Sequence, residues 1–258
     1  MAADETGSAV VARRANRLAT AGCLTILIAL ITVLGVLASW LWYRHWHDGK
    51  LSSERRDRAS ASVLEQARAT ADATARALGT SGATGTDALI GVIWRHTQAP
   101  VITYDASHRE FTATAARSAL YDEEALLPGG GPVRVTRCIV FAYAHRPGQP
   151  WTSRVSERDG DVCRPGTAIA GLVRIAQTRI ASMPAGDLTR AGVQEALDPT
   201  GRLPSYDVRS AVRTAGLVTV SILLSSPDTA VGQCYRFTRP VAGDGGQGSA
   251  TAVPVSPC

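Results

Sequence analysis

The sequence predicts an α+β domain that follows a single N-terminal transmembrane helix. Three observations lead to this fold class: an uncharged apolar run near the N-terminus, short β-branched segments grouped between helical patterns, and four cysteines after the apolar run. Helices and strands that are grouped rather than alternating favour a mostly antiparallel sheet with packed helices. The chain has 258 residues, 45% hydrophobic and 19% charged, which is enough for an ordinary domain beside the apolar run.

The apolar run covers residues 21–43 (AGCLTILIALITVLGVLASWLWY) and contains no charge and no proline. As a helix it spans roughly 34 Å, more than the roughly 30 Å of a bilayer's hydrocarbon core. It is apolar on all sides, which favours a membrane helix over a buried soluble one. A cleaved signal peptide is the alternative, because Val36-Leu37-Ala38 resembles a cleavage site, but the run is too long for one. We expect a retained anchor, with residues 1–20 as a cytoplasmic tail.

The segment WLWYRHWHDGK, residues 40–50, is predicted to lie at the membrane interface. Aromatic side chains at the end of an apolar span are typical of the headgroup region. Two histidines, His45 and His47, raise the alternative of a metal site, but their spacing places them about 200° apart on a helix. The predicted interface residues are Trp40, Trp42, Tyr43 and Trp46.

The orientation of the span rests on two opposing signals. Basic residues lie on both sides of the span and are more numerous after it, so the positive-inside rule alone favours a cytoplasmic C-terminal domain. Four cysteines after the span suit two disulfides, which persist in oxidising compartments, and long domains are exported largely regardless of charge. We therefore expect a single-pass protein of the cell membrane with a cytoplasmic N-terminus and an extracytoplasmic domain.

A juxtamembrane helix and linker are predicted over residues 44–85. Small apolar residues repeat with a helical period in this segment, at Leu64, Ala67, Ala71, Thr74 and Leu78. Three interpretations remain open: a stalk, a self-association surface, or a helix laid on the domain. Gly35 and Ser39 in the span form a small-x-x-x-small pair, which is compatible with a homodimer. Asp48-Gly49 suits a helix stop, and GTSGATG (79–85) suits a flexible linker.

The extracytoplasmic domain is predicted over residues 86–239, and its first half contains most of the expected strands. A helix from residue 86 ends before Pro100, and strands follow at 101–105, 110–115 and 132–145. Residues 118–127 (SALYDEEALL) are ambiguous and suit a helical turn. The segment WTSRVSERDGDVC, from residue 151, is predicted to return along the strand at 132–145.

The second half of the domain begins with the clearest helix, over residues 167–183, whose apolar residues form one core-facing stripe. Asp187 suits the cap of a shorter helix that ends at Leu197. A hairpin around Ala215-Gly216 and a third strand over 229–238 complete a predicted three-strand meander. Residues 240–258 form a Gly/Pro-rich tail, ordered in expectation only at Cys258.

The four cysteines after the span allow three disulfide pairings. Cys138 lies in the strongest strand, and Cys163 follows the segment expected to return along it, so these two residues suit a cross-link. Cys234 lies in the last expected strand, and pairing would give Cys258 a reason to be ordered. We predict the pairs Cys138–Cys163 and Cys234–Cys258 and an unpaired Cys23 in the anchor.

The chemistry-bearing residues predict no catalytic, cofactor or metal site. Asp105, Ser107 and His108 are adjacent in TYDASHRE, whereas a working triad converges from separate elements, so a polar turn is the preferred interpretation. The carboxylates of ERDGD (157–161) do not follow the calcium-loop pattern and suit a solvated hairpin tip. Interspersed charge and a net charge of +5 predict no nucleic-acid partner.

A broad resemblance accompanies these residues. The arginine-rich N-terminus, one anchor, an alanine-rich exported domain and the late CYRFT strand with a terminal cysteine are similar to single-pass membrane proteins of actinobacteria, a resemblance that implies no activity. We expect an anchored extracytoplasmic binding or scaffolding protein whose partners are the lipid bilayer and an envelope protein or cell-wall component. The alternatives are an anchored envelope hydrolase that uses Asp105, Ser107 or His108, and a sensory ectodomain with a separate cytoplasmic partner.

Overall fold

The computed structural model describes the backbone of residues 6–123, 131–202, 204–241, 249–256 and 258, with side chains from residue 25 onward except at 45 and 48. Cys23, which was predicted to be unpaired, and His45 have side chains outside the described part of the structure. The structure confirms the α+β class, although it forms two antiparallel four-strand sheets where one sheet was predicted. The chain divides into two compact units: residues 1–57 with 122–133, and residues 58–121 with 134–258.

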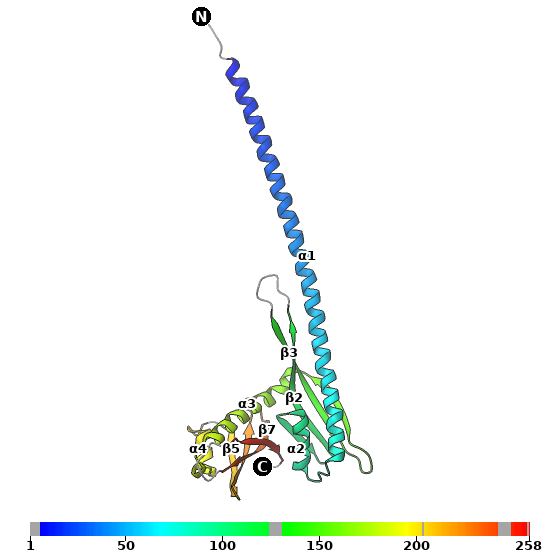
Figure 1. Cartoon of the computed structure of the whole chain (residues 1–258), viewed down its shortest axis with the longest axis vertical. Coiled ribbons are helices and arrows are strands. Elements are labelled where there is room, and N and C mark those ends of the chain that lie inside the picture. Colours follow the sequence, from blue (N-terminus) through cyan, green and yellow to red (C-terminus); the bar gives the residue numbers. More distant parts are fainter. Residues whose placement is uncertain (1–5, 124–130, 203, 242–248, 257) are drawn as a thin grey trace. The chain divides into compact units, whose positions relative to one another are not determined.

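The first unit contains most of helix α1 (Thr6–Thr80), which Figure 1 shows as one uninterrupted helix. The expected stop at Asp48-Gly49 is wrong, because the helix continues through it. One glycine costs a helix only about 1 kcal/mol, and the alanine-rich segment that follows is a good helix former. The unit also holds residues 122–133, and within it Arg55 donates a hydrogen bond to the Asp122 carbonyl oxygen at 3.2 Å.

The first sheet lies mainly in the second unit and has the order β1-β2-β3-β4. Its strands are β1 (Val101–Asp105), β2 (Glu110–Asp122), β3 (Pro132–Ala144) and β4 (Thr152–Arg158). β1 pairs with β2 from Val101 opposite Thr114, and β3 pairs with β4 from Cys138 opposite Arg158. β2 continues to Asp122, so the helical turn expected from residue 118 is wrong over the described residues. Alanine, leucine and glutamate favour helix locally, but strand pairing overrides that preference.

The core of this sheet is completed by the last turns of α1 and by α2 (Thr86–Thr97). From α1 come Val63, Ala67, Ala71 and Leu78, which are buried together with strand residues of the sheet. Of the three interpretations of the alanine stripe, the structure therefore supports a helix laid on the domain. The compact unit starts at Arg58 rather than at residue 86. Alanine side chains are small enough for the helix to approach the strands closely.

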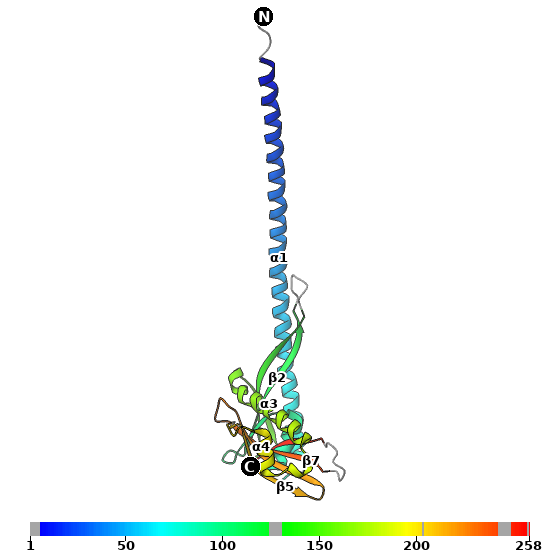
Figure 2. The ribbon, with the colours of Figure 1, turned by 90° about the vertical axis from the view of Figure 1, so that its left-hand side faces the viewer.

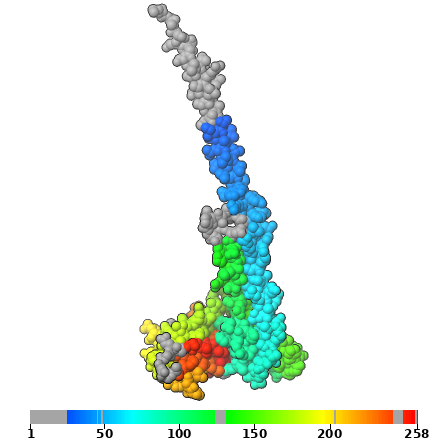
Figure 3. Space-filling model, viewed as in Figure 1, coloured from blue at the N-terminus to red at the C-terminus, as the bar shows by residue number. Residues whose placement is uncertain are grey.

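The second sheet has the order β5-β6-β7-β8: β5 (Tyr206–Thr214), β6 (Leu217–Ser225), β7 (Gly232–Pro240) and β8 (Thr251–Val255). Ala215 and Gly216 both have positive φ, 43° and 81°, as a two-residue primed turn requires. The expected meander of three strands has a fourth, because part of the predicted tail forms β8 (red in Figure 3). Pro254 is tolerated there because β8 is an edge strand.

Helices α3 (Gly160–Ser182) and α4 (Arg190–Leu197) pack against the second sheet (Figure 2), with the short 3-10 turn η1 (Ala185–Asp187) between them. α3 begins at Gly160 rather than at residue 167, so the expected hairpin tip is instead the start of a helix. The cap of α4 is Thr189, whose hydroxyl accepts a hydrogen bond from the Gly192 amide at 3.1 Å. Asp187 belongs to η1, so its predicted capping role is wrong.

Buried polar contacts join the two sheets. The Gln233 side chain, 4% exposed, accepts a hydrogen bond from the Ile102 amide at 3.0 Å and donates one to the Val255 carbonyl oxygen at 3.0 Å. The Tyr235 hydroxyl donates to the Pro100 carbonyl oxygen at 2.8 Å. At Gly166 of α3, an added Cβ would lie 3.2 Å from Pro100, so glycine permits the close approach of α3 to β1.

Candidate functional site

The apolar segment of α1 is the first functional feature. By length and composition, α1 is the one helix of the described residues that could cross a membrane, with a mean hydropathy of 2.2 over its most apolar window. Large apolar side chains between Ile26 and Trp46 are 47% to 73% exposed. A contiguous apolar surface of this extent is typical of a membrane or partner interface. The structure supports the predicted span in composition and exposure.

The aromatic residues at the end of this segment lie beside cations one helical turn away. The Arg44 guanidinium lies 5.1 Å from the centre of the Trp40 ring, and the Lys50 ammonium lies 5.9 Å from that of Trp46. Tyr43 stacks on His47 with ring centres 5.9 Å apart. Amphipathic rings next to basic side chains suit the boundary between hydrocarbon and headgroups.

Two disulfides brace the second unit. They join Cys138 to Cys163 and Cys234 to Cys258, with Cα–Cα distances of 5.5 and 5.3 Å, and these are the two pairs predicted from the sequence. The first bond connects β3 to α3, so it links the first sheet to a helix that packs on the second. The second bond connects β7 to the segment after β8 and holds that edge strand in place.

The turn between β1 and β2 brings Asp105, Ser107 and His108 together. The Ser107 hydroxyl donates to Asp105 Oδ1 at 2.5 Å, and His108 Nδ1 lies 2.7 Å from Asp105 Oδ2 and 2.9 Å from Ser107 Oγ. Asp105 Oδ1 also accepts from the Ser107 amide at 2.8 Å. These contacts are the hydrogen bonds of an Asx-type turn.

The geometry of this cluster differs from a hydrolase relay. A relay needs the serine proton to pass to one histidine nitrogen while the other nitrogen meets the carboxylate. Here Ser107 donates to the carboxylate, and His108 uses the same Nδ1 atom toward both partners. Contact with Asp105 raises the pKa of His108, and the side-chain contacts of Ser107 and His108 lower the pKa of Asp105. The cluster therefore favours an exposed ion pair.

The acidic stretch at 157–161 is dispersed over three structural positions. Glu157 lies in β4 and pairs with Arg137 at 3.2 Å, Asp159 precedes α3, and Asp161 in its first turn pairs with Arg164. An acidic residue in the first turn complements the helix dipole. Across the described side chains, no group of three or more potential ligands could hold a metal ion.

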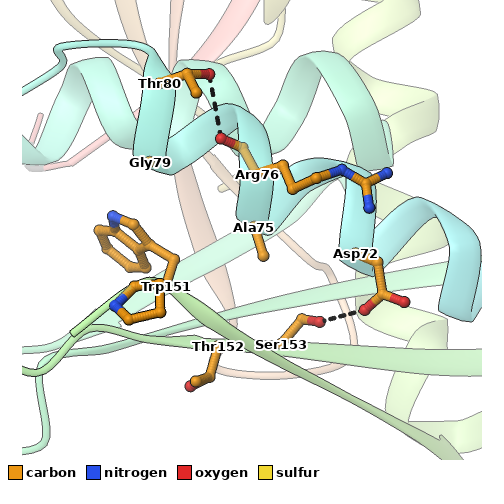
Figure 4. Close-up of a pocket in the computed structure, with 9 residues that line it drawn as sticks. Asp72, Ala75, Arg76, Gly79, Thr80, Trp151, Thr152 and Ser153 are labelled. Atoms are coloured by element: carbon orange, nitrogen blue, oxygen red, sulfur yellow. Dashed lines mark hydrogen bonds between the residues drawn. The ribbon is translucent and has the colours of Figure 1, made fainter.

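A groove with a volume of about 720 Å³ lies between the last turns of α1 and the start of β4 (Figure 4). Its helical wall consists of residues one turn apart that share a face, and its other wall begins β4. Both walls lie in the second unit. The side chains that matter for its chemistry are Asp72, Arg76, Gly79 and Thr80 of α1, and Trp151, Thr152 and Ser153.

Two aromatic rings contact Trp151, which forms the aromatic wall of the groove. His145 stacks on the Trp151 indole with ring centres 4.9 Å apart, and Phe111 lies 6.0 Å from it. Phe111 belongs to the buried core of the first sheet, and Trp151 packs against that core. Across the groove, Ser153 donates a hydrogen bond to Asp72 Oδ1 at 2.9 Å, which links β4 to α1. The indole therefore has a fixed position at the groove wall.

A smaller cavity of about 320 Å³ lies where α2, α3 and the second sheet meet. Trp94, Arg174 and Tyr235 are among its lining residues. Burial raises the pKa of Tyr235 well above its ordinary value, so its hydroxyl stays neutral and donates to Pro100. This cavity is part of the junction between the sheets.

The sequence did not reveal the groove. Trp151 follows a Pro/Gly-containing loop, and Asp72 and Arg76 lie on the polar side of a helix, where charged residues are usual. One signal was present: Asp72, Arg76 and Thr80 repeat at i, i+4, i+8, and Gly79 leaves a gap beside them. That pattern identifies a helix face without indicating what it faces.

The comparisons with known proteins add no relative. No protein-family model, curated protein or solved structure matches this chain.

Proposed function

We propose that this chain is a membrane-anchored, extracytoplasmic protein that binds or scaffolds a partner of the cell envelope. The observation that carries the proposal is α1, which bears the exposed apolar segment and then contributes core residues to a domain with two disulfides. Disulfides persist in oxidising compartments, which supports export of this domain. The N-terminus is then cytoplasmic, and the tryptophans from Trp40 to Trp46 lie at the interface.

A binding role is supported by the groove of about 720 Å³ beside Trp151. Ligand sites are concave, contain an aromatic or apolar wall, and have a few polar groups that fix orientation. This groove has all three properties. The Asp105 turn, the strongest enzymatic candidate in the sequence, has the contacts of an exposed ion pair, which supports binding over hydrolysis.

Sidedness is tested by the cysteines. Intact cells are treated with a membrane-impermeant alkylating reagent, and the extracted full chain is mapped by peptide analysis without reductant. We expect Cys138, Cys163, Cys234 and Cys258 to be recovered as two disulfide-linked peptide pairs. Free thiols at all four positions would place the domain in the cytoplasm and refute the proposal.

The binding role is tested by site-specific photo-crosslinking in intact cells. A crosslinking amino acid at Thr80, an exposed residue that lines the groove, should capture an envelope protein or cell-wall component. The matched control carries the same amino acid at Val212, which is 55% exposed on β5 of the other sheet. If both positions yield the same products, or neither yields any, the groove is not the binding surface.

The hydrolase alternative has its own test. Purified full chain is assayed against a panel of ester, amide and glycoside substrates beside the His108→Ala variant. We expect no turnover that His108→Ala abolishes. A hydrolytic rate that depends on His108 would favour the enzyme and count against a purely binding role.

A further inference from the structure

We infer that the groove between α1 and β4 binds the sugar ring of a neutral glycan. This inference rests on the proposed extracytoplasmic location, where cell-wall and surface glycans are available, and it names the class of partner that the groove would take. Three properties of the groove carry it: a fixed aromatic surface, paired donors and acceptors, and a lining without net charge.

The aromatic surface is the Trp151 indole. A pyranose ring presents a face of C–H groups, and an indole presents an electron-rich face that attracts positively polarised hydrogens. Because Trp151 already contacts the His145 and Phe111 rings, with centres 4.9 and 6.0 Å away, the indole loses little conformational freedom when a ligand stacks on it. Figure 4 shows the indole beside the helix turn that carries Ala75 and Gly79.

Hydrogen-bond donors and acceptors also line the groove. Sugar hydroxyls both donate and accept hydrogen bonds, so a sugar site needs both functions within a few ångströms. Asp72 supplies carboxylate acceptors and Arg76 supplies guanidinium donors, and the Thr80 hydroxyl, which donates to the Arg76 carbonyl oxygen at 3.1 Å, can accept. These three residues are exposed and line the groove. The Ser153 hydroxyl holds Asp72 in place through its 2.9 Å hydrogen bond.

The charge of the lining selects among ligands. Asp72 and Arg76 cancel each other, so a phosphate or carboxylate ligand meets one repulsive carboxylate, and a cationic ligand meets one repulsive guanidinium. A neutral ligand rich in hydroxyls satisfies both side chains. A proline-rich peptide is the other neutral occupant, but the grooves that bind such peptides are lined by several aromatic side chains, and this groove has one.

The groove also has room for a ring. Its volume of about 720 Å³ lies within the roughly 300–1,000 Å³ of ligand pockets. Gly79 contributes to this room, because a Cβ added there would meet nothing within 4 Å. A larger side chain at residue 79 would extend into the groove, and its Cβ would not clash with any neighbouring atom. Gly79 therefore offers a substitution that tests occupancy and spares the core.

The experiment uses the full chain in a detergent without a sugar headgroup, since an alkyl glycoside would compete for the site. Tetra-N-acetylchitotetraose and cellotetraose, two neutral β-linked probes, are titrated calorimetrically against the wild type and the variant Gly79→Leu. The matched control is Gly91→Leu in α2, where an added Cβ also meets nothing within 4 Å. Thr80→Phe, at the exposed end of α1, is a second blocking variant in case Gly79→Leu does not fold.

We expect at least one probe to bind the wild type and Gly91→Leu equally, and to bind Gly79→Leu or Thr80→Phe about tenfold more weakly or worse. The inference is overturned if neither probe binds at about 1 mM, or if the blocking variants bind like the wild type. Loss of binding in Gly91→Leu would place the site elsewhere and also overturn it. Binding of a proline decapeptide in place of both sugars would identify a peptide groove.

These outcomes are separate from the test of the proposed function. Disulfide-linked peptides from intact cells together with no sugar binding would leave an exported binding protein whose groove takes another ligand. Free thiols would remove the proposed function whatever the titrations show.

Discussion

The two sheets of the second unit are built alike and packed differently. Each is an antiparallel meander of four strands with helices on one face. The first sheet meets α1 through small residues such as Ala67 and Ala71, whereas the second meets α3 and α4 through larger ones such as Ile180 and Leu197. The first sheet also carries the groove and the Asp105 turn. The contrast indicates a thin, close-packed contact on the side that bears the candidate site and a thicker core on the other.

The difference follows from what each helix must do. α1 is long because it also carries the apolar segment, and its domain end buries a narrow stripe of mostly small residues. Helix and strands therefore approach closely, and where the stripe ends at Gly79 the helix has no side chain to fill the space beside Trp151. α3 and α4 bury large aliphatic residues such as Ile180 and Leu197, so they form a thicker core against the second sheet.

The largest effect is expected in the core of the second sheet. Phe237 is fully buried there, and Phe237→Ala removes its contacts and leaves a cavity that its neighbours fill only in part. We expect a loss of about 3–5 kcal/mol in the free energy of unfolding, measured by denaturant titration of the full chain in detergent. Val212→Ala, on the exposed part of β5, should change it by less than about 0.5 kcal/mol. Equal losses at both positions would contradict the thick-core description.

Removal of either disulfide is expected to cause the next largest loss in the free energy of unfolding. The two bonds close segments with sequence separations of 25 and 24, so in the chain-entropy model each double replacement by alanine costs about 3–4 kcal/mol. The local consequences should differ. Loss of Cys234–Cys258 should expose the β8 amides to hydrogen exchange, and loss of Cys138–Cys163 should affect β3 and α3. Matching exchange patterns in the two variants would show that the bonds do not divide the structure as described.

Overpacking tests the close contact of α1. Ala71→Leu adds volume at a position that is 1% exposed, which should cost about 1–3 kcal/mol because the helix must move away from the strands. Ala69→Leu makes the same change on the exposed side of the same helix and serves as the control. The unfolding temperatures of the two variants are compared in the full chain in detergent. If Ala71→Leu is neutral, the helix is not closely packed on the sheet.

The smallest effect is expected at the Asp105 turn. Contact with Asp105 raises the pKa of His108 above its usual 6.5, so Asp105→Asn should return the value toward 6.5 in a histidine NMR titration. Ser107→Ala keeps the ion pair and should leave the pKa of His108 raised. An unchanged pKa in Asp105→Asn would show that the ion pair does not form.

The same shifts give this turn a pH window. The raised pKa of His108 makes its contribution to stability full below 6.5 and lost as the pH rises through the folded value. The lowered pKa of Asp105 makes its contribution present above 3.8 and lost as the pH falls toward the folded value. The ion pair therefore stabilises the turn between these limits. Because both side chains are exposed, only a small change in unfolding temperature with pH is expected.

Hydrophobic periodicity, turn residues and the placement of the cysteines made much of the fold predictable. The apolar run, the strand at 132–145 and the hairpin at Ala215-Gly216 each carry a local signal of their own. The cysteine pairs followed from strand placement and from the need to order Cys258. These features depend on residues close in sequence, where helix, strand and turn preferences act directly.

The remaining features depend on partners distant in sequence. β8 has little strand signal, and it forms because β7 offers an open edge and a disulfide holds its end. Asp187 and Thr189 are both favoured cap types, and the path of the chain makes Thr189 the cap although aspartate is the stronger cap type. The groove needs Trp151 and Asp72 to meet across 79 positions of chain (151 − 72), which no local pattern indicates.

The buried junction at Gln233 also bears on the order in which the chain folds. Each sheet is formed by neighbouring hairpins, whose short loops close at little entropic cost. The bonds from Ile102 to Gln233 and from Tyr235 to Pro100 bridge separations of 131 and 135 residues, so they can form only after both hairpin sets exist. The hydrogen bonds of Gln233 therefore form late in folding. Substitutions at Gln233 should increase the unfolding rate far more than they decrease the folding rate.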